Sequence, residues 1–161
     1  MELLSKSINI VANIIDGLEA KRVKKEDPFI HDQFALFMSH LPSPVFIKDK
    51  DSNLIFANKA MKDLIGWSES DFGKHTTELV PPEFAKKMVS DDKRVLENGP
   101  EIIHEEVRGI NGKLYYYETH KFPFTKKNGD LYLGAIAIDE TERILAEEAL
   151  LKSEENFRQL L

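Results

Sequence analysis

The sequence predicts an α+β domain: a five-stranded antiparallel sheet with inserted helices on one face, flanked by an N-terminal helical extension and a C-terminal helix. Two observations predict it. Five short segments are rich in apolar, β-branched and aromatic residues, and helical spacing fills the intervals before, between and after them. The segments come as a pair and then as three in succession, an order that favours one antiparallel sheet with a helical insertion.

Composition narrows the classes of function. The chain has 161 residues, 42% of them hydrophobic, which suffices for one domain with a core. Its net charge of −6 argues against a nucleic-acid surface. Because there is no cysteine, disulfides, thiolate zinc sites, thiol catalysis and cysteinyl cofactor adducts are excluded. No apolar run approaches the roughly 20 residues that span a bilayer, and the start lacks a signal-peptide pattern, so we expect a cytoplasmic domain.

Residues 1–35 are expected to form the helical extension. Apolar residues in its first part follow steps of four and three, the spacing of a coiled-coil seam. This helix either lies on its own domain or pairs with its copy in a dimer, and the pattern leaves both readings open. A second helix begins at Asp27-Pro28 and ends before Pro42. The candidate dimerisation residues are Leu4, Ile8, Val11, Ile15 and Leu18.

The first two strands are predicted at residues 45–48 and 54–57, with a turn at 49–53 whose side chains bond their own backbone. Short helices follow. Asn58 caps the first of them, Gly66 stops it, and Ser68 with Asp71 resembles a capping box. Pro81-Pro82 then opens the longest inserted helix, which spans residues 83–97.

Three strands close the sheet, at residues 101–108, 113–122 and 131–138. The last one is apolar, with isoleucine at alternate positions, and runs directly into Asp139, which can bond free backbone N–H groups as an N-cap does. A strong helix-forming segment follows to residue 161. A buried strand therefore continues into an exposed helix with almost no loop between them.

This order of elements, and several short sequences within it, resemble a PAS sensor domain. Residues 41–51 (LPSPVFIKDKD) look like the opening strand and turn of that family, and residues 55–60 (IFANKA) look like its second strand. LIGW at 64–67, LVPPE at 79–83 and DKRVLENG at 92–99 match the inserted helices. KFP at 121–123 looks like the end of the fourth strand. Asp139-Glu-Thr141-Glu-Arg143 resembles the Asp-x-Thr element that joins a PAS core to its output helix.

The resemblance covers roughly residues 36–145 and implies a sensory domain, usually dimeric, in a histidine kinase or another multidomain signalling protein. It divides the chain into the extension, a PAS domain at 36–140 and a signalling helix at 141–161. Residues 153–161 look like the first helix of a following PAS domain, so we expect this chain to be part of a longer sensor. The residues expected to relay the signal are Asp139, Thr141 and Arg143.

The resemblance also places a ligand between the inserted helices and the sheet. Core packing is the competing interpretation for most of these side chains, and helix capping competes for Asn58. His120 shares a face with Tyr116, Glu118 and Phe122 by strict alternation, and that face contacts a ligand, a helix or solvent. The pocket candidates are Asn58, Met61, Ile65, Trp67, Phe84, Met88 and His120.

The sequence does not identify a cofactor, but it argues against two of them. A cysteinyl–flavin adduct is excluded, and haem is disfavoured because residues 83–97 hold no histidine. We expect no metal and no catalytic residues in this chain, since its carboxylates are scattered and no phosphate loop is present. His40 and His104 are not expected to accept phosphate. The expected function is small-ligand sensing by a homodimer, and the alternative is a ligand-free dimerisation module.

Overall fold

The computed structural model describes residues 28–161, with side chains from residue 33 onward. The candidate dimerisation residues, from Leu4 to Leu18, lie outside the described residues. The first described helix, α2, spans Pro28–His40. It lies beside the next helix along the chain and beside one edge of the sheet, where Phe34 and Phe56 have ring centroids 6.1 Å apart.

A five-stranded antiparallel sheet forms the centre of the domain, as the sequence predicts. Its strands are β1 (Val45–Asp49), β2 (Leu54–Ala57), β3 (Glu101–Arg108), β4 (Leu114–Thr125) and β5 (Leu131–Asp139). Their order across the sheet is β2-β1-β5-β4-β3. The closing strand β5 therefore lies in the middle, between β1 and β4, so it is paired along both of its edges.

The helical insertion between β2 and β3 contains α3 (Lys59–Ile65), a 3₁₀ turn (Glu69–Asp71), α4 (Thr76–Leu79) and α5 (Pro82–Asn98). Gly66 ends α3 with a φ of 81°, a left-handed conformation that glycine adopts without steric cost. The four-residue helix α4 was not predicted. Its capping box joins His75 and Glu78, but a single turn is too short for apolar periodicity to reveal.

The main core lies between the sheet and the inserted helices. Leu133 and Ala135 of β5 face Met61 of α3 and Val95 of α5 in one buried cluster, and we call this side of the sheet the inner face. On the outer face, Ile47, Phe122 and Phe124 form a smaller cluster. Alternate residues of each strand thus serve two different cores.

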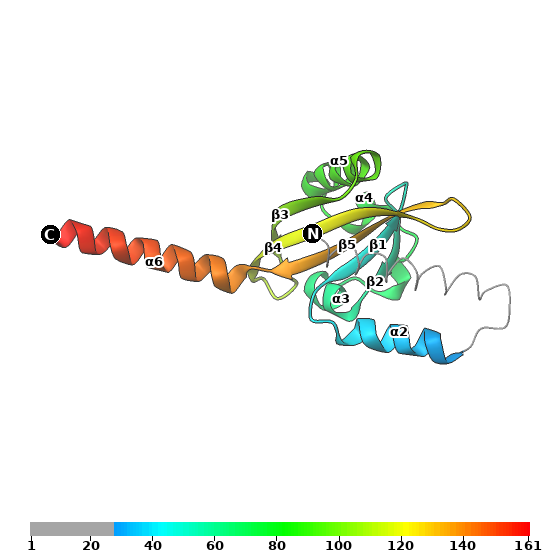
Figure 1. Ribbon diagram of the computed structural model, residues 1–161, viewed down its shortest axis with the longest axis horizontal. Helices are drawn as coiled ribbons and strands as arrows, with labels where there is room; N and C mark the ends of the chain where they lie inside the picture. Colours follow the sequence, from blue (N-terminus) through cyan, green and yellow to red (C-terminus); the bar gives the residue numbers. More distant parts are fainter. Residues whose placement is uncertain (1–27) are drawn as a thin grey trace.

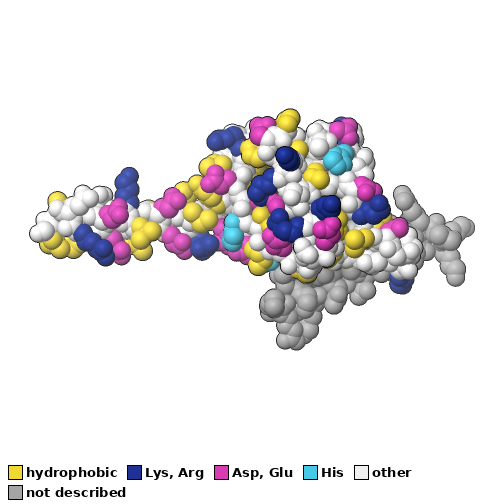
Figure 2. All heavy atoms as spheres, turned by 90° about the horizontal axis from the view of Figure 1, so that it is seen from above, with side chains coloured by type: hydrophobic (Ala, Val, Ile, Leu, Met, Phe, Trp, Pro, Cys, Tyr) yellow, Lys and Arg dark blue, Asp and Glu magenta, His cyan; other side chains and the backbone are white. Residues whose placement is uncertain are grey.

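The last helix, α6 (Thr141–Leu160), extends away from the body of the domain (Figure 1). Nearly all of its residues are exposed after the first turn. Hydrophobic side chains alternate with charged ones along this projection (Figure 2). The predicted direct passage from the last strand into a helix is confirmed, since Glu140 alone separates β5 from α6.

Candidate functional site

Two lysines and one aspartate form a buried charged group on the inner face. Lys48 Nζ lies 2.7 Å from Asp92 Oδ2, and Lys121 Nζ lies 2.8 Å from Asp92 Oδ1. The side chains of all three residues are at most 1% exposed. We call these three residues the Lys–Asp–Lys triad. Since fully buried lysine and aspartate are rare unless paired, the triad is the most unusual feature of the interior.

The sheet register brings the two lysines together. Lys48 of β1 pairs with Leu133 of β5, and Lys121 of β4 pairs with Ala135 of the same strand. Directly paired residues share a face, and Leu133 and Ala135 both belong to the inner core. Both lysines therefore extend from the inner face, on either side of β5.

Helix α5 supplies the carboxylate. Ala85, Asp92 and Val95 are buried along one side of this helix, at steps of seven and three that place them on a common face. Asp92 consequently occupies a position where the pattern calls for an apolar residue. Its neighbour Asp91 is also buried, but it is bonded at the helix surface to Lys87 and Arg94 instead.

The pKa values of Lys48 and Asp92 are both shifted from their ordinary values. Burial lowers the pKa of Lys48 below its ordinary value of 10.5, against the attraction of Asp92. Burial alone would raise the pKa of Asp92, but the charges of Lys48 and Lys121 and their hydrogen bonds outweigh it and hold that pKa below 3.8. Asp92 is therefore an anion at neutral pH, and its negative charge is shared by two amines.

A polar row continues from the triad along the inner face of β4. Thr119, two residues from Lys121, donates its hydroxyl proton to Glu105 Oε2 at 3.0 Å. Tyr117, two residues further, is 7% exposed, and burial together with the nearby charge of Asp139 raises its pKa to about 12. Charged and polar groups thus run from the centre of the interior towards the end of β4 that adjoins α6.

An apolar wall lies beside the triad. The rings of Phe46 and Trp67 meet edge to face with centroids 6.4 Å apart, and Lys48 Nζ lies 5.3 Å from the centroid of Phe46. Met61 and Trp67 are buried in the inner core, and Ile65 packs against it. These three pocket candidates therefore lie in the packed core, as the competing interpretation of core packing describes, and a ligand contact by them stays a prediction.

Asn58 joins three backbone segments. Its Oδ1 accepts the N–H groups of Val45 and Met61 at 2.9 and 3.0 Å, and its Nδ2 donates to the carbonyl of Ser43 at 2.9 Å. The capping interpretation accounts for these bonds, because the amide oxygen satisfies the first turn of α3 while the whole amide fixes the start of β1. A ligand contact by Asn58 stays a prediction.

Two pocket candidates are placed elsewhere. Phe84 is 56% exposed in the first turn of α5, so it does not line the interior. His120 pairs with Ile102 and Ile136, and Ile136 packs against the outer cluster. The histidine therefore lies on the outer face, with Nε2 2.7 Å from Glu118 and a buried Nδ1 that has no hydrogen-bond partner among the described residues. Met88 is half-buried on α5.

The junction between β5 and α6 is held by three hydrogen bonds. Asp139 Oδ1 accepts the N–H of Thr141 at 2.9 Å, which is the predicted cap-like bond, although the strand extends to Asp139 itself. Thr141 Oγ1 accepts the N–H of Tyr116, and the N–H of Glu140 donates to the carbonyl of Tyr116. The start of α6 is therefore bonded to β4 as well as to β5. Arg143 instead bonds Glu140 and Glu147 on the helix surface.

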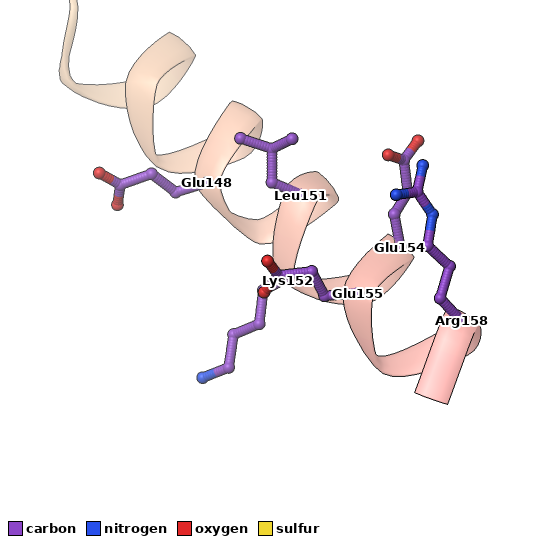
Figure 3. A pocket seen from close by; sticks show the side chains of 6 residues that line it. All are labelled: Glu148, Leu151, Lys152, Glu154, Glu155 and Arg158. Atoms are coloured by element: carbon purple, nitrogen blue, oxygen red, sulfur yellow. The ribbon is translucent and has the colours of Figure 1, made fainter. Parts of the chain in front are cut away.

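Two surface grooves accompany this interior. One, of about 510 Å³, is lined by residues of α2, α3 and β4, among them His40, Asp63 and Tyr117. The other is a hollow formed by side chains of α6 alone, which fan around a single helix (Figure 3) and make no enclosed site. Neither groove reaches the triad, but Tyr117 belongs both to the first groove and to the polar row of β4.

The pattern of α5 contained a signal for the triad that the sequence analysis missed. Met88, Asp92 and Val95 follow helical steps of four and three, so a charge stood on an apolar face. Lys48 likewise alternates with the core residue Phe46. Each observation places a charged residue on a partly apolar face, but neither specifies that the two charges meet.

Comparison with known proteins identifies the family. The family model described as the PAS fold matches residues 38–145, about two thirds of the chain. The chain belongs to the PAS fold family. The triad and its polar row thus lie in the interior of a PAS domain, between the inserted helices and the sheet, and the junction lies at its C-terminal boundary.

Solved structures agree with this fold. VqmA of Vibrio cholerae, described as a dimer studied in the absence of its target DNA, superposes with a TM-score of 0.62 at 24% identity, over 70% of this chain and 52% of VqmA. A structure of VqmA bound to DPO gives 0.59 at 24% identity, over 67% and 56% of the two chains. The PAS domain of BvgS from Bordetella pertussis gives 0.58 at 21% identity, over 81% of this chain and 97% of that domain.

A curated relative is much longer than this chain. It is an uncharacterised protein, y4lL, of Sinorhizobium fredii, 29% identical over 132 residues. The match spans 79% of this chain but 16% of the relative. In the described residues of the present PAS domain, no helix is both long and apolar enough to cross a membrane.

Proposed function

We propose that this PAS domain is the sensory input of a longer signalling protein. A small ligand binds between α5 and the inner face of the sheet, and the bound state is relayed through β5 and β4 into α6. The observation that carries this proposal is the junction: Thr141 takes part in hydrogen bonds to both Asp139 and Tyr116, on neighbouring strands. A shift of either strand therefore moves the first turn of α6.

The relay requires a partner for α6, and a second copy of the chain provides it. Leu150, Phe157 and Leu160 are 62%, 65% and 84% exposed. Their spacing of seven and three places them along one side of the helix, as in a coiled-coil seam. A ligand that binds one arrangement of the two helices more tightly than the other shifts the equilibrium between them. The similar protein VqmA is described as a dimer.

The output domain we propose is a histidine kinase, on the strength of the sequence resemblance, with this chain acting as a non-enzymatic, cytoplasmic input. VqmA, which superposes on this domain, is described with a target DNA, so a domain of this fold also occurs in a chain that binds DNA. The net negative charge of this domain argues against nucleic-acid binding by the domain itself. It does not exclude a nucleic-acid-binding output domain elsewhere in the parent protein.

A ligand-free dimerisation module is the second candidate. The observation in its favour is the dense interior, in which Leu54, Val95 and Leu133 are completely buried. Native mass spectrometry of the protein purified from its own host separates the two functions. A bound small molecule supports sensing, whereas ligand-free protein that dimerises normally supports the module.

The relay is tested by replacing Asp139 and Thr141 with alanine in the intact parent protein. We expect the signal-dependent change in output to be lost while the thermal unfolding of the PAS domain stays a single cooperative transition. Lys152→Ala is the control, because Lys152 is exposed on α6 beyond its first turn, whereas Arg143 stays a predicted member of the relay. Normal signalling by the double variant would refute the relay.

A further inference from the structure

The triad has more hydrogen-bond donors than acceptors. A protonated lysine has three N–H donors, and each lysine of the triad donates to a single oxygen of Asp92. No other described residue accepts a hydrogen bond from either Nζ. Even a neutral amine has two N–H donors, so at least one donor of each lysine is unused, apart from the contact of Lys48 with the face of Phe46. Buried donors without acceptors are costly, so the arrangement favours an additional acceptor.

The local charge points to the same kind of acceptor. Two amines share one carboxylate, and both are at most 1% exposed. Glu101, Glu105 and Asp91 are further carboxylates whose charges interact with these lysines. Glu101 is bonded to Arg94. Glu105 accepts its hydrogen bond from Thr119, however, and Asp91 is bonded to Lys87 and Arg94. The two amines therefore share a single bonded carboxylate, that of Asp92.

The surroundings indicate what the anion is attached to. Phe46 adjoins Lys48 and Trp67 adjoins Phe46, and Leu133 and Ala135 of β5 lie between the two lysines. These residues pack in the inner core, so the surroundings of the two amines are apolar. An organic acid places its carboxylate against the ammonium groups and its apolar body against the aromatic wall.

We propose that the ligand of this PAS domain is a small organic carboxylate with an apolar body, held by Lys48 and Lys121 in competition with Asp92. The proposal rests on the sensory function proposed above and adds the chemical class of the ligand. Asp92 acts as the resident counter-ion. Asp92 lies on α5, and both lysines lie on the sheet. An incoming carboxylate therefore weakens the ion pairs that join α5 to the sheet, and ligand binding changes the packing of α5.

The direct test compares acids with their neutral amides on the intact chain. Benzoate and hexanoate are titrated by calorimetry beside benzamide and hexanamide, with inorganic phosphate as a second anion. We expect at least one acid to bind tenfold or more tightly than its amide, and phosphate not to bind. Equal binding of acid and amide, binding of phosphate in place of the acids, or no binding by any probe would overturn the proposed ligand class.

Variants of the triad locate the binding. Lys48→Met leaves the Lys121–Asp92 pair intact and electrically neutral, so the variant is expected to fold and to bind the acid at least tenfold more weakly. Asp92→Asn removes the competing carboxylate at nearly constant shape, and is expected to bind the acid at least tenfold more tightly. A structural role for the triad would not change affinity in opposite directions, and unchanged affinity in Lys48→Met would refute the site.

A second measurement uses thermal stability, in place of affinity, as its readout. Acetate is added to Asp92→Ala protein, with acetamide as the control, and the midpoint of thermal unfolding is recorded. We expect acetate to raise the midpoint by several degrees more than acetamide, and this difference to disappear when Lys48→Met is added. Equal effects of acetate and acetamide would count against an anion site between the lysines.

These outcomes are distinguishable from a failure of the sensory function. If neutral amides bind as well as acids and alter signalling by the parent protein, the domain is a sensor and the carboxylate assignment is wrong. If acids bind through the lysines but signalling does not change, the ligand class is correct and the relay is wrong.

Discussion

Asp92 is the residue on which the interior depends most, because two ammonium groups share its carboxylate. Removing one member of a buried ion pair leaves an uncompensated charge, which typically costs about 3–5 kcal/mol. Removing Lys48 has a different consequence, since the remaining Lys121–Asp92 pair is neutral. Removing Asp92 should therefore destabilise the fold more than removing Lys48 does.

The lowered pKa of Asp92 predicts how the stability of the domain depends on pH. The pKa of Asp92 lies below its ordinary value of 3.8 in the folded chain, so the unfolded chain binds a proton at a higher pH than the folded chain does. Stability is therefore fully present above about pH 4 and falls as the pH decreases through the folded pKa. We expect urea unfolding between pH 2.5 and 6 to show this loss, and Asp92→Asn to reduce its slope.

Asp71→Asn provides the control for this experiment. The hydrogen bond from Lys74 also lowers the pKa of Asp71, but the pair lies on the surface, where solvent screens it. This variant should keep the acid dependence of the wild-type protein. An unchanged slope in Asp92→Asn would mean that other carboxylates control acid unfolding.

At the scale of elements, the pairing of β4 with β5 includes one unusually close contact, between the backbone of one strand and a side chain of the other. Gly134 of β5 lies opposite Phe122 of β4, and a Cβ built on the glycine would be 2.5 Å from Phe122 Cε2. The phenyl ring therefore lies over the position where a side chain would be. This contact explains a glycine in the middle of a central strand, where it is otherwise unfavourable.

Gly134→Ala should consequently destabilise the domain by about 1–3 kcal/mol, through displacement of the phenyl ring. The loss should be smaller when the same substitution is made in a Phe122→Leu background, because leucine lacks the ring atoms that the new Cβ would meet. The free energies of unfolding of the four proteins form a double-mutant cycle that measures the contact. An equal loss in both backgrounds would show that the ring is not responsible.

The elements also show what the sequence could predict. The strands were predictable because their apolar residues alternate and their turns use residues such as Asp49 and Gly129. The passage from β5 into α6 was predictable because Asp139 follows a buried strand directly. The triad was not predicted, since a lysine in a strand and an aspartate in a helix usually face solvent. Its assembly depends on the pairing of β1 and β4 with β5, which no local pattern specifies.

His120 and Phe84 show that sequence periodicity alone does not predict which residues line the interior. Alternation correctly groups His120 with Phe122 on one face, but it does not say which face the inserted helices cover. Phe84 has the apolar character of a core residue, and its position in the first turn of α5 nevertheless leaves it exposed. Local periodicity assigns residues to faces, and only tertiary packing decides which face becomes the interior.

At the scale of the whole molecule, α6 is a lever about 30 Å long, since an α-helix of 20 residues rises about 1.5 Å per residue. It meets the body of the domain at its first turn, where Thr141 is bonded to β4 (Figure 1). In the proposed relay, a small rotation of the sheet at this end displaces the far end of the helix by a larger distance. A single helix with so many exposed apolar side chains gains stability by burying them against a partner.

The chain offers a matched pair of residues for testing that partner. Leu150 and Leu151 are adjacent, identical and equally exposed, at 62% and 63%. Consecutive helical residues point about 100° apart, so Leu150 lies on the side shared with Phe157, and Leu151 lies away from it. We expect Leu150→Asp to weaken dimerisation at least tenfold in sedimentation equilibrium and Leu151→Asp to leave it nearly unchanged. The reason is that only the first substitution buries a carboxylate in the seam. If the two variants behave alike, the two copies of α6 do not pair along this side, and the relay from sheet to helix requires another partner.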